Sequence, residues 1–225
     1  MNNIFTAFSG GKDSVVLHFL LKEANVKPNL IHCVTTIDPP GTISFCQKMG
    51  AQLVRSDKSF LDLVEKKGLP TMFRRFCCEY LKEKYLGPKG FFGIRKMESV
   101  KRSKCYDDFA QIRHYKKDQY TEQFFPLLYM TDEDIETIVN EHSLEMHPLY
   151  YDSTGQFCVK RRLGCLGCPL QGDRGVRDYM EYPKLFRLVM KRLVQYHINH
   201  DRTAHDAYLN AVYQLFYSSH GHKKY

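Results

Sequence analysis

Residues 9–14 read SGGKDS and stand between two apolar runs, residues 4–8 (IFTAF) and residues 15–21 (VVLHFLL). A turn of small residues between a strand and a helix lets backbone N–H groups converge on an anion, and the positive end of the helix dipole adds to the attraction. The stretch therefore predicts a phosphate-binding loop. Its members are Ser9, Gly10, Gly11, Lys12, Asp13 and Ser14. The alternative is a plain glycine turn in which Asp13 or Ser14 caps the helix.

The sequence after this loop alternates between strand and helix patterns. Strands are expected at residues 4–8, 30–37 and 52–55, and helices at residues 13–25, 42–49 and 60–67. A further pair, a strand at 124–129 and a helix at 131–142 with Thr131 as its N-cap, follows later. This alternation predicts an α/β fold, a Rossmann-like parallel sheet with helices on both faces, with the loop at the carboxyl end of a strand.

The chain changes character beyond residue 170. Residues 183–200 and 204–217 carry apolar side chains at helical spacing, with basic residues around the first set. We expect a nucleotide-binding α/β domain over residues 1–170, which includes the cysteine motifs, and a C-terminal helical extension over residues 171–225.

The composition limits the class of protein. The 225 residues include 33 Lys and Arg against 25 Asp and Glu, a net charge of +8, which suits phosphate-rich partners without identifying nucleic acid. No apolar stretch approaches the length of a membrane span, and the start does not resemble a signal peptide, so we expect a cytoplasmic protein without a membrane partner. In that compartment the eight cysteines indicate metal or redox chemistry, because thiols stay reduced there.

Four cysteines form two motifs. Cys77 and Cys78 are adjacent, and Cys165 and Cys168 form a CxxC flanked by glycines and a proline. Neighbouring cysteines present both sulfurs poorly to one tetrahedral zinc ion, whereas a cubane offers each sulfur its own iron. The motifs therefore favour a 4Fe-4S cluster, with zinc as the alternative occupant.

A second charged motif lies at residues 93–102, GIRKMESVKR. Gly93 begins it, Arg95 and Arg102 offer fork-shaped donors to a phosphate or sulfate, and Glu98 is placed to orient one of them. The alternative is the solvated basic start of a helix.

These motifs together resemble one family. SGGKDS is similar to the loop of the ATP pyrophosphatase superfamily, and the CC and CxxC pair resembles the cluster signature of adenylylsulfate reductases, within the phosphoadenosine phosphosulfate (PAPS) reductase family. GIRKMESVKR looks like that family's GIRxxESxxR element. The resemblance implies that Lys82, in CCEYLK, lies beside cluster and nucleotide, and that Asp38, in TTIDPPGT, belongs to a loop over the nucleotide.

Two departures from the reductases direct the functional hypothesis. Reductases of this family attack with a cysteine near the C-terminus, and this sequence has no cysteine after Cys168. Lys12 is typical of members that cleave ATP between the α and β phosphates, where a lysine and Mg²⁺ neutralise the departing pyrophosphate. An intact loop with a cluster signature is similar to the ATPase component of DNA phosphorothioation systems and to cluster-dependent thiolases.

The leading hypothesis is therefore an enzyme that uses ATP with Mg²⁺ to activate an acceptor, releases pyrophosphate and assists sulfur transfer with an iron-sulfur cluster. Lys12 and Asp13 are the expected catalytic residues, and nucleic acid is a candidate acceptor. The first alternative is a reductase of phosphoadenylylsulfate or adenylylsulfate that uses an external thiol. The second is a non-catalytic nucleotide-sensing module. The sequence leaves open the acceptor, the sulfur donor or partner protein, and the oligomeric state.

Overall fold

The computed structural model describes residues 4–116 and 119–218. Its strands are β1 (Phe5–Ala7), β2 (Asn29–Val34), β3 (Gln52–Arg55), β4 (Lys89–Phe91), β5 (Ala110–Lys116) and β6 (Gln119–Phe124). Its helices are α1 (Lys12–Glu23), α2 (Thr42–Lys48), α3 (Phe60–Lys67), α4 (Phe76–Leu81), α5 (Val100–Cys105), α6 (Asp132–Glu141), α7 (Asp173–Glu181), α8 (Pro183–Ile198) and α9 (Ala204–Tyr213). Short 3-10 turns occupy Glu83–Tyr85, Lys96–Glu98, Pro148–Tyr150 and Pro169–Gln171, and a π-helical turn occupies Gln214–Ser218.

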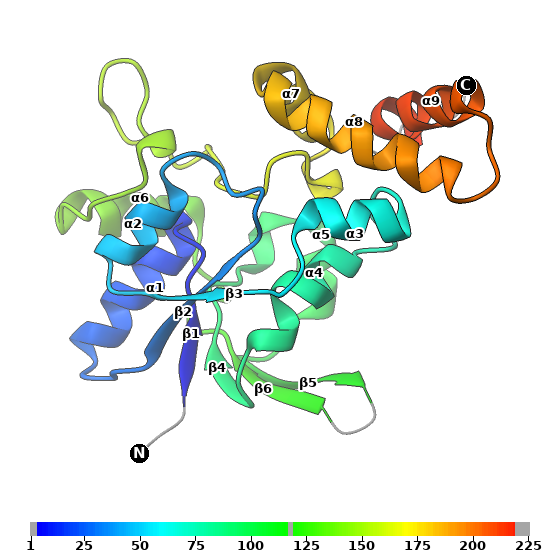
Figure 1. Ribbon diagram of the computed structural model, residues 1–225. Coiled ribbons are helices and arrows are strands. Elements are labelled where there is room, and N and C mark those ends of the chain that lie inside the picture. Colours follow the sequence, from blue (N-terminus) through cyan, green and yellow to red (C-terminus); the bar gives the residue numbers. More distant parts are fainter. Residues whose placement is uncertain (1–3, 117–118, 219–225) are drawn as a thin grey trace. The chain divides into compact units, whose positions relative to one another are not determined.

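The strands form one sheet in the order β3-β2-β1-β4-β6-β5 (Figure 1). β1 pairs in parallel with β2 on one side and β4 on the other, and β4 pairs in parallel with β6. Only β5, at the edge, runs antiparallel to its neighbour β6 among the described pairings. The predicted α/β class with a mainly parallel sheet is confirmed.

The strand order places a topological switch point beside β1. The chain moves outward from β1 to β2 and β3, then returns to the other side of β1 as β4. Ligands of open α/β sheets bind outside the carboxyl ends of the strands at such a point. The SGGKDS loop leaves the carboxyl end of β1 there and leads directly into α1 (Figure 1).

Two predicted strands differ from those in the structure. β2 stops at Val34 rather than residue 37, because Thr36 adopts a left-handed backbone conformation with φ of 66° that breaks an extended strand. The strand expected at residues 124–129 is wrong: β6 occupies Gln119–Phe124, and residues 126–129 form a turn that begins at Pro126, which has no N–H for a sheet ladder. The helix expected at residues 131–142 is present as α6, with the Thr131 side chain capping it.

The described residues form two compact units. Unit 1 contains residues 4–33, 40–54, 85–116 and 119–164, and unit 2 contains residues 34–39, 55–84 and 165–218. The boundary expected near residue 170 stays a prediction, because compactness alone does not show which segment folds independently. No described helix combines the length and apolar character needed to cross a membrane.

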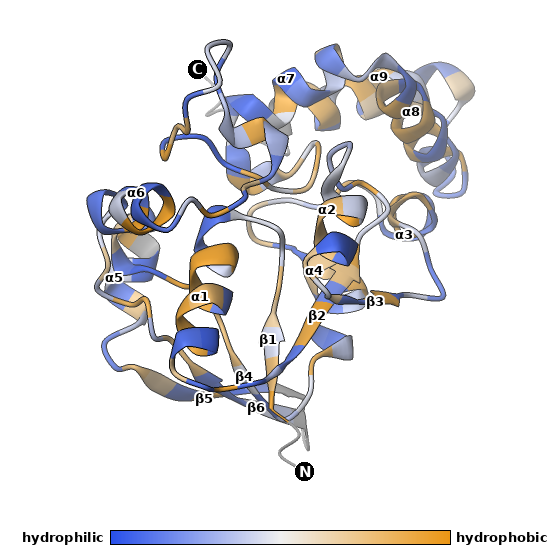
Figure 2. Ribbon diagram, turned by 90° about the vertical axis from the view of Figure 1, so that its left-hand side faces the viewer, coloured by the Kyte–Doolittle hydropathy of each residue, from blue (hydrophilic) through white to orange (hydrophobic). Residues whose placement is uncertain are grey.

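Each unit has its own hydrophobic core. In unit 1 the apolar side of α1 packs with residues of α2, α6 and the segment after α6; Val16, Leu17, Leu127 and Ile135 are fully buried there. In unit 2 α8 packs against α3 and α9, with Val64, Val189, Leu193 and Leu215 fully buried. Figure 2 shows hydrophobic and hydrophilic residues alternating along α1 and α8, as expected for helices with one buried side.

Candidate functional site

The SGGKDS loop in unit 1 is closed by its own serines. The Ser14 hydroxyl donates to the Gly11 carbonyl at 2.8 Å and lies 3.3 Å from the Ser9 hydroxyl, which also accepts from the Gly11 amide at 3.3 Å. Gly11 is the N-cap of α1 and supplies no capping side chain, so the alternative of a turn capped by Asp13 or Ser14 does not describe the loop. The amides of Asp13 and Ser14 lie in the first turn of α1, where helical amides have no intrahelical acceptor. They are placed to bind an anion.

Two glycines let the backbone of this region pack closely. Gly10 has a φ of 75°, and a Cβ there would lie 3.1 Å from the Cys46 sulfur. A Cβ on Gly93, which follows β4, would lie 3.0 Å from the carbonyl carbon and oxygen of Asp13. The loops after β1 and β4 therefore touch at the switch point, and the predicted site residue Gly93 is brought against the SGGKDS loop.

Lys12 is the cation of the loop. Its side chain is 5% exposed, and its ammonium lies 3.7 Å from Asp13 Oδ2. Burial lowers the pKa of Lys12 below its usual value, and the neighbouring Asp13 carboxylate opposes part of that shift. A buried cation with first-turn amides beside it suits an anion of high charge, such as a polyphosphate.

Arg95 is brought to the same place but is fully engaged within the protein. Its Nε donates to Asp13 Oδ1 at 2.6 Å, and one terminal nitrogen donates to Asp132 Oδ1 at 2.7 Å. The other terminal nitrogen donates to the Met130 carbonyl at 3.2 Å, and the side chain is 1% exposed. The sequence suggested that Arg95 would offer its fork to a phosphate. In the structure the guanidinium group of Arg95 is hydrogen-bonded to Asp13, so Arg95 positions the SGGKDS loop.

Glu98 joins two further arginines to this network. It accepts from the Arg95 backbone amide at 3.2 Å and pairs with Arg102 one helical turn later. Arg162 lies 3.6 Å from the other carboxylate oxygen of Glu98. Arg102 and Arg162 are partly exposed, so their guanidinium groups remain accessible to an anion. Arg162 acts electrostatically on Lys12, which places it close to the loop.

Tyr150 is a loop contact that the sequence reasoning missed. Its buried hydroxyl accepts from the Lys12 amide at 3.0 Å and from the Leu163 amide at 3.2 Å. Nothing in the adjacent letters distinguishes Tyr150 from Tyr151, so no local signal could have identified it. For Arg162 a signal existed, the basic run KRR at residues 160–162 just before the CxxC motif.

The two cysteine motifs meet in unit 2. Cys77 and Cys78 occupy the first turn of α4, and their thiols are hydrogen-bonded to each other. Cys165 and Cys168 both act electrostatically on Cys77. Lys82 is hydrogen-bonded to Cys165 and acts on Cys78. The structure therefore gathers all four predicted metal ligands and Lys82 in one place.

Asp38 lies in the same unit and acts electrostatically on Lys82. Its carboxylate accepts from the Thr35 amide at 2.8 Å, and the Thr35 hydroxyl lies 3.6 Å from the Cys165 sulfur. Asp38 and Lys82, which the resemblance assigns to the nucleotide, are thus found beside the cysteines, and their contact with a nucleotide stays a prediction.

The protons of the thiols are distributed unevenly. The hydrogen bond from the Cys77 thiol lowers the pKa of Cys78 to about 6, and the charge of Lys82 acts in the same direction. The same bond, together with burial, raises the pKa of Cys77. Burial raises the pKa of Cys168 to about 11, and the interaction with Cys165 raises the pKa of Lys82. One of the paired thiols is therefore ready to act as a thiolate ligand.

The turn between Cys165 and Cys168 is fixed by α7. Gly167 has a φ of 67°, and a Cβ there would lie 2.3 Å from the Tyr179 hydroxyl oxygen. Its amide donates to Asp178 Oδ2 at 2.8 Å. Only glycine fits this position, which explains the glycine inside the CxxC motif.

The two expected occupants make different demands on the thiols. Among the described residues, no group of three or more His, Cys, Asp or Glu side chains is arranged to hold a metal ion. Tetrahedral zinc would bring its sulfurs to within about 3.8 Å of each other, from a Zn–S length of ~2.3 Å. The 4Fe-4S cluster and zinc therefore both stay predictions for these four thiols.

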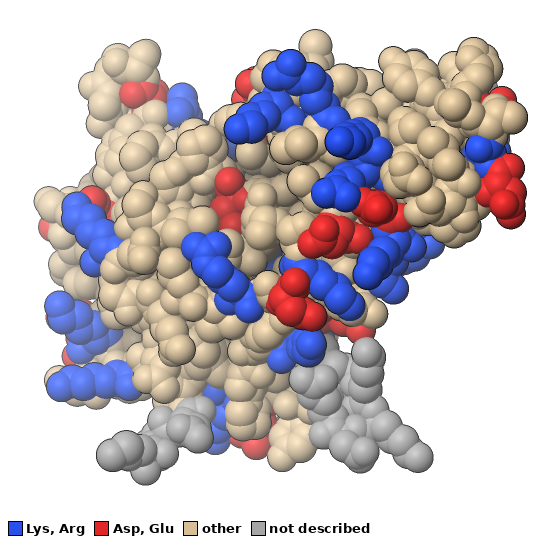
Figure 3. All heavy atoms as spheres, in the orientation of Figure 1, with Lys and Arg blue, Asp and Glu red and all other residues tan. Residues whose placement is uncertain are grey.

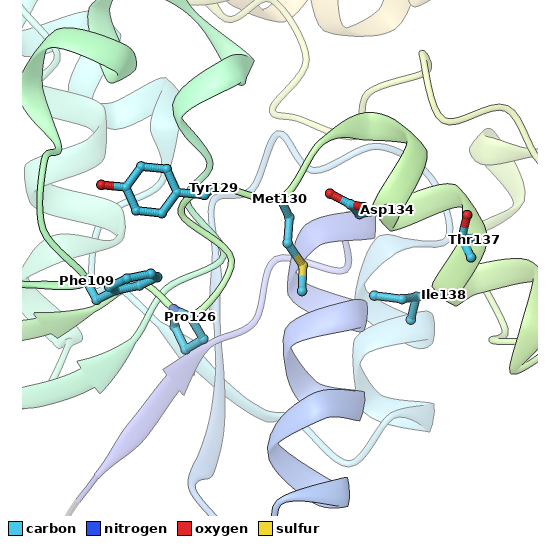
Figure 4. A pocket seen from close by; sticks show the side chains of 7 residues that line it. All are labelled: Phe109, Pro126, Tyr129, Met130, Asp134, Thr137 and Ile138. Atoms are coloured by element: carbon cyan, nitrogen blue, oxygen red, sulfur yellow. The ribbon is translucent and has the colours of Figure 1, made fainter.

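A hollow of about 530 Å³ lies elsewhere in unit 1, between the segment after β6 and α6 (Figure 4). It is lined by Phe109, Pro126, Tyr129, Met130, Asp134, Thr137 and Ile138. This lining contains no lysine or arginine and none of the predicted site residues. The hollow is therefore a poor receptor for phosphate groups, and we assign it no ligand.

Comparison with known proteins gives four findings. An uncharacterized protein of Methanocaldococcus jannaschii, MJ0973, is 29% identical over 201 residues, a match that covers 81% of this chain and 46% of the relative. The chain thus spans about half the length of that relative. Among solved structures, the phosphoadenylyl-sulfate reductase of Candida auris in complex with phosphate matches with a TM-score of 0.50 at 12% identity, over 73% of this chain and 82% of that one.

A third match is the U34-tRNA thiolase NcsA of Methanococcus maripaludis with its [4Fe-4S] cluster, with a TM-score of 0.41 at 15% identity, over 95% of this chain and 72% of that one. The likeness to the reductase supports the fold alone, and that to the thiolase is too distant to support an argument.

The family model is more specific, since the phosphoadenosine phosphosulfate reductase domain matches residues 3–171, three quarters of the chain. The chain therefore belongs to the phosphoadenosine phosphosulfate reductase domain family.

Proposed function

We propose that this protein binds ATP at the SGGKDS loop, activates an acceptor with release of pyrophosphate, and assists transfer of sulfur to that acceptor. The observation that carries the proposal is the position of Lys12, a buried cation beside the first-turn amides of α1 at the switch point of the sheet. In the reaction an acceptor oxygen attacks the α phosphorus and the bond to the β phosphate's bridging oxygen breaks, so pyrophosphate leaves with the electron pair. Lys12 and the Mg²⁺ of the nucleotide neutralise that charge.

The residues around the loop have separate roles in this proposal. The amides of Asp13 and Ser14 bind phosphate oxygens, and Arg102 offers a partly exposed guanidinium. Arg95 fixes the Asp13 carboxylate and thereby the first turn of α1. Asp13 balances the charge of Lys12 until the nucleotide arrives.

The thiols of unit 2 form the second part of the proposal. Cys77, Cys78, Cys165 and Cys168 would hold a 4Fe-4S cluster, which supplies soft iron sites for binding sulfur. Lys82 would stabilise the thiolate ligands through its charge, since it already interacts with Cys165 and Cys78. Asp38 would favour the charged form of Lys82, on which it acts electrostatically.

The test is release of pyrophosphate from Mg-ATP by protein purified without oxygen. We expect Lys12→Ala and Asp13→Ala to abolish nucleotide-dependent turnover, because they remove the charge that meets the phosphates and the carboxylate that Arg95 holds. Lys48→Ala is the matched control, since Lys48 forms only an exposed ion pair with Glu145. Unchanged turnover in Lys12→Ala would show that the loop is wrongly assigned.

Family membership favours a second candidate, reduction of phosphoadenylylsulfate or adenylylsulfate with an external thiol. Calorimetric titration with Mg-ATP and with each sulfated nucleotide separates the two candidates by preference. Sulfite produced from a sulfated nucleotide in the presence of a dithiol would establish reduction. Nucleotide binding without turnover under any of these conditions would instead indicate a sensing module.

A further inference from the structure

A fully exposed phenylalanine stands at the tip of a closed turn in unit 2. The Thr71 amide donates to the Arg74 carbonyl at 3.2 Å, and the Arg74 amide donates back to the Thr71 hydroxyl at 3.1 Å. Between them, Met72 is 44% exposed and Phe73 is 98% exposed. The turn therefore presents an aromatic ring to solvent, although burial of such a ring is normally favourable.

The sequence around this turn is strongly basic. Residues 66–75 read KKGLPTMFRR, with four Lys and Arg and no Asp or Glu. Arg74 donates to the Lys67 carbonyl at 2.5 Å, which fixes the turn to the end of α3. The ammonium groups of Lys67 and Lys58 lie 5.0 and 5.8 Å from the ring centre of Tyr80. Three cations and two aromatic rings therefore share one surface.

Two carboxylates of α3 are engaged with other partners. Asp62 accepts from the amide and hydroxyl of Ser59 and caps α3, and Glu65 pairs with Arg192. In the part of the chain that the structure describes, Lys58 and Lys67 have no carboxylate partner. Figure 3, in the orientation of Figure 1, shows Lys and Arg side chains gathered over the region of α3 and α4, with Asp and Glu between them.

We propose that Lys58, Lys67, Phe73, Arg74 and Tyr80, here called the stacking surface, bind a single-stranded nucleic acid. The inference rests on the proposed function, because it names the class of acceptor. The lysines and Arg74 would contact phosphates, and an unpaired base would stack on Phe73. A duplex hides the faces of its bases, so it would use the charges and not the ring. Phe73 precedes the Cys77 and Cys78 pair by four residues, so the bound strand would lie on the unit that gathers the thiols.

The test is fluorescence anisotropy of labelled single-stranded DNA and RNA oligonucleotides of one sequence, with the full chain, against the corresponding duplex. We expect Phe73→Ala to weaken single-strand binding by about tenfold, as loss of one stacked base does. We expect Lys67→Gln to weaken it and to reduce its salt dependence by about one phosphate contact. Met180→Ala, at an exposed apolar position of α7, and Lys184→Gln, at an exposed charge of α8, are the matched controls and should bind as the parent protein does.

The outcomes separate this inference from the proposed function. Tighter binding of either single strand than of the duplex, with a loss confined to the stacking-surface variants, supports it, and the preferred sugar identifies DNA or RNA. Equal binding of duplex and single strand, or full affinity in Phe73→Ala, would overturn it. Pyrophosphate release and Mg-ATP binding should be unchanged in Phe73→Ala, so a failure here leaves the nucleotide loop standing. A protein that binds the oligonucleotide but neither binds Mg-ATP nor releases pyrophosphate from it would instead refute the proposed function.

Discussion

The loop of unit 1 and the thiols of unit 2 are organised in opposite ways. Around the loop the buried charges are balanced: Arg95 faces two carboxylates, and Lys12 faces Asp13. Around the thiols, Cys77 and Cys78 are hydrogen-bonded to each other, and Lys82 is hydrogen-bonded to Cys165. The buried charges around the loop already have partners before any ligand binds. The thiols of unit 2 would have to lose their protons when a metal binds.

The difference shows where each site obtains its stability. A balanced network of buried charges contributes to the fold itself, and removing one partner leaves another buried charge without compensation. A set of thiols contributes mainly through the metal it holds, because binding energy enters only when the metal is present. Substitutions of the buried charges should therefore destabilise the fold of unit 1, whereas substitutions of the thiols should remove the metal from unit 2.

The largest effect is expected for the thiols. Cys78→Ser should remove essentially all bound iron, because it replaces the thiol with the lowered pKa by a poor ligand. The measurement is iron content and visible absorbance after anaerobic purification. Cys105→Ser is the control, since Cys105 is exposed and outside both motifs. Full iron content in Cys78→Ser would show that Cys78 is not a ligand. It would also weaken the contrast drawn between the loop of unit 1 and the thiols of unit 2.

The next largest effect is expected for Arg95. Arg95→Met should lower the free energy of unfolding by about 3–5 kcal/mol, because it leaves Asp13 and Asp132 without their buried partner. Urea denaturation measures it. The exposed pair Lys48–Glu145 provides the control, with less than about 1 kcal/mol expected for Lys48→Ala.

A triple variant tests the cause of that loss. Adding Asp13→Asn and Asp132→Asn to Arg95→Met removes the stranded charges and should restore part of the stability. If the triple variant is no more stable than Arg95→Met, the loss comes from packing of the arginine and not from charge balance.

A smaller effect is expected from pH. Burial lowers the pKa of Lys12, so as pH rises Lys12 should lose its charge earlier than an ordinary lysine. Affinity for Mg-ATP should therefore start to fall at a pH below the ordinary lysine value of 10.5 in the parent protein, whereas Lys12→Arg, which stays charged, should keep its affinity over the same range. Calorimetric titration at each pH gives both curves. Parallel curves would mean that Lys12 carries its charge throughout.

The smallest effect is expected for Tyr150. Tyr150→Phe leaves the ring but removes the acceptor of the Lys12 and Leu163 amides, which should weaken Mg-ATP binding by about fivefold, or ~1 kcal/mol. Tyr151→Phe is the matched control, because the Tyr151 hydroxyl accepts only from the Met146 amide among the described contacts. Equal affinities in the two variants would show that the loop does not depend on Tyr150.

The sequence predicted those features that depend on residues close together in the chain. The loop, α1, α3 and the Thr131 cap follow from short patterns, because periodicity and capping act within a few residues. The gathering of the cysteines followed from their spacing and a family resemblance. The engagement of Arg95 could not be predicted, since Asp132 is 37 residues away and only the folded sheet brings the two together. Tyr150 was hidden for the same reason, 138 residues from Lys12.

The way the chain is divided between its two units limits which truncations and segment exchanges would leave a folded protein. Unit 2 is made of three separate stretches, and its core combines Phe60 and Leu63 from the first third of the chain with Val189 and Leu193 from the last third. A protein shortened at residue 170 would lose half of that core while keeping all four cysteines. Exchange of parts between relatives, in the laboratory or in evolution, must therefore move several segments together, and a single cut cannot deliver the thiols in a folded setting.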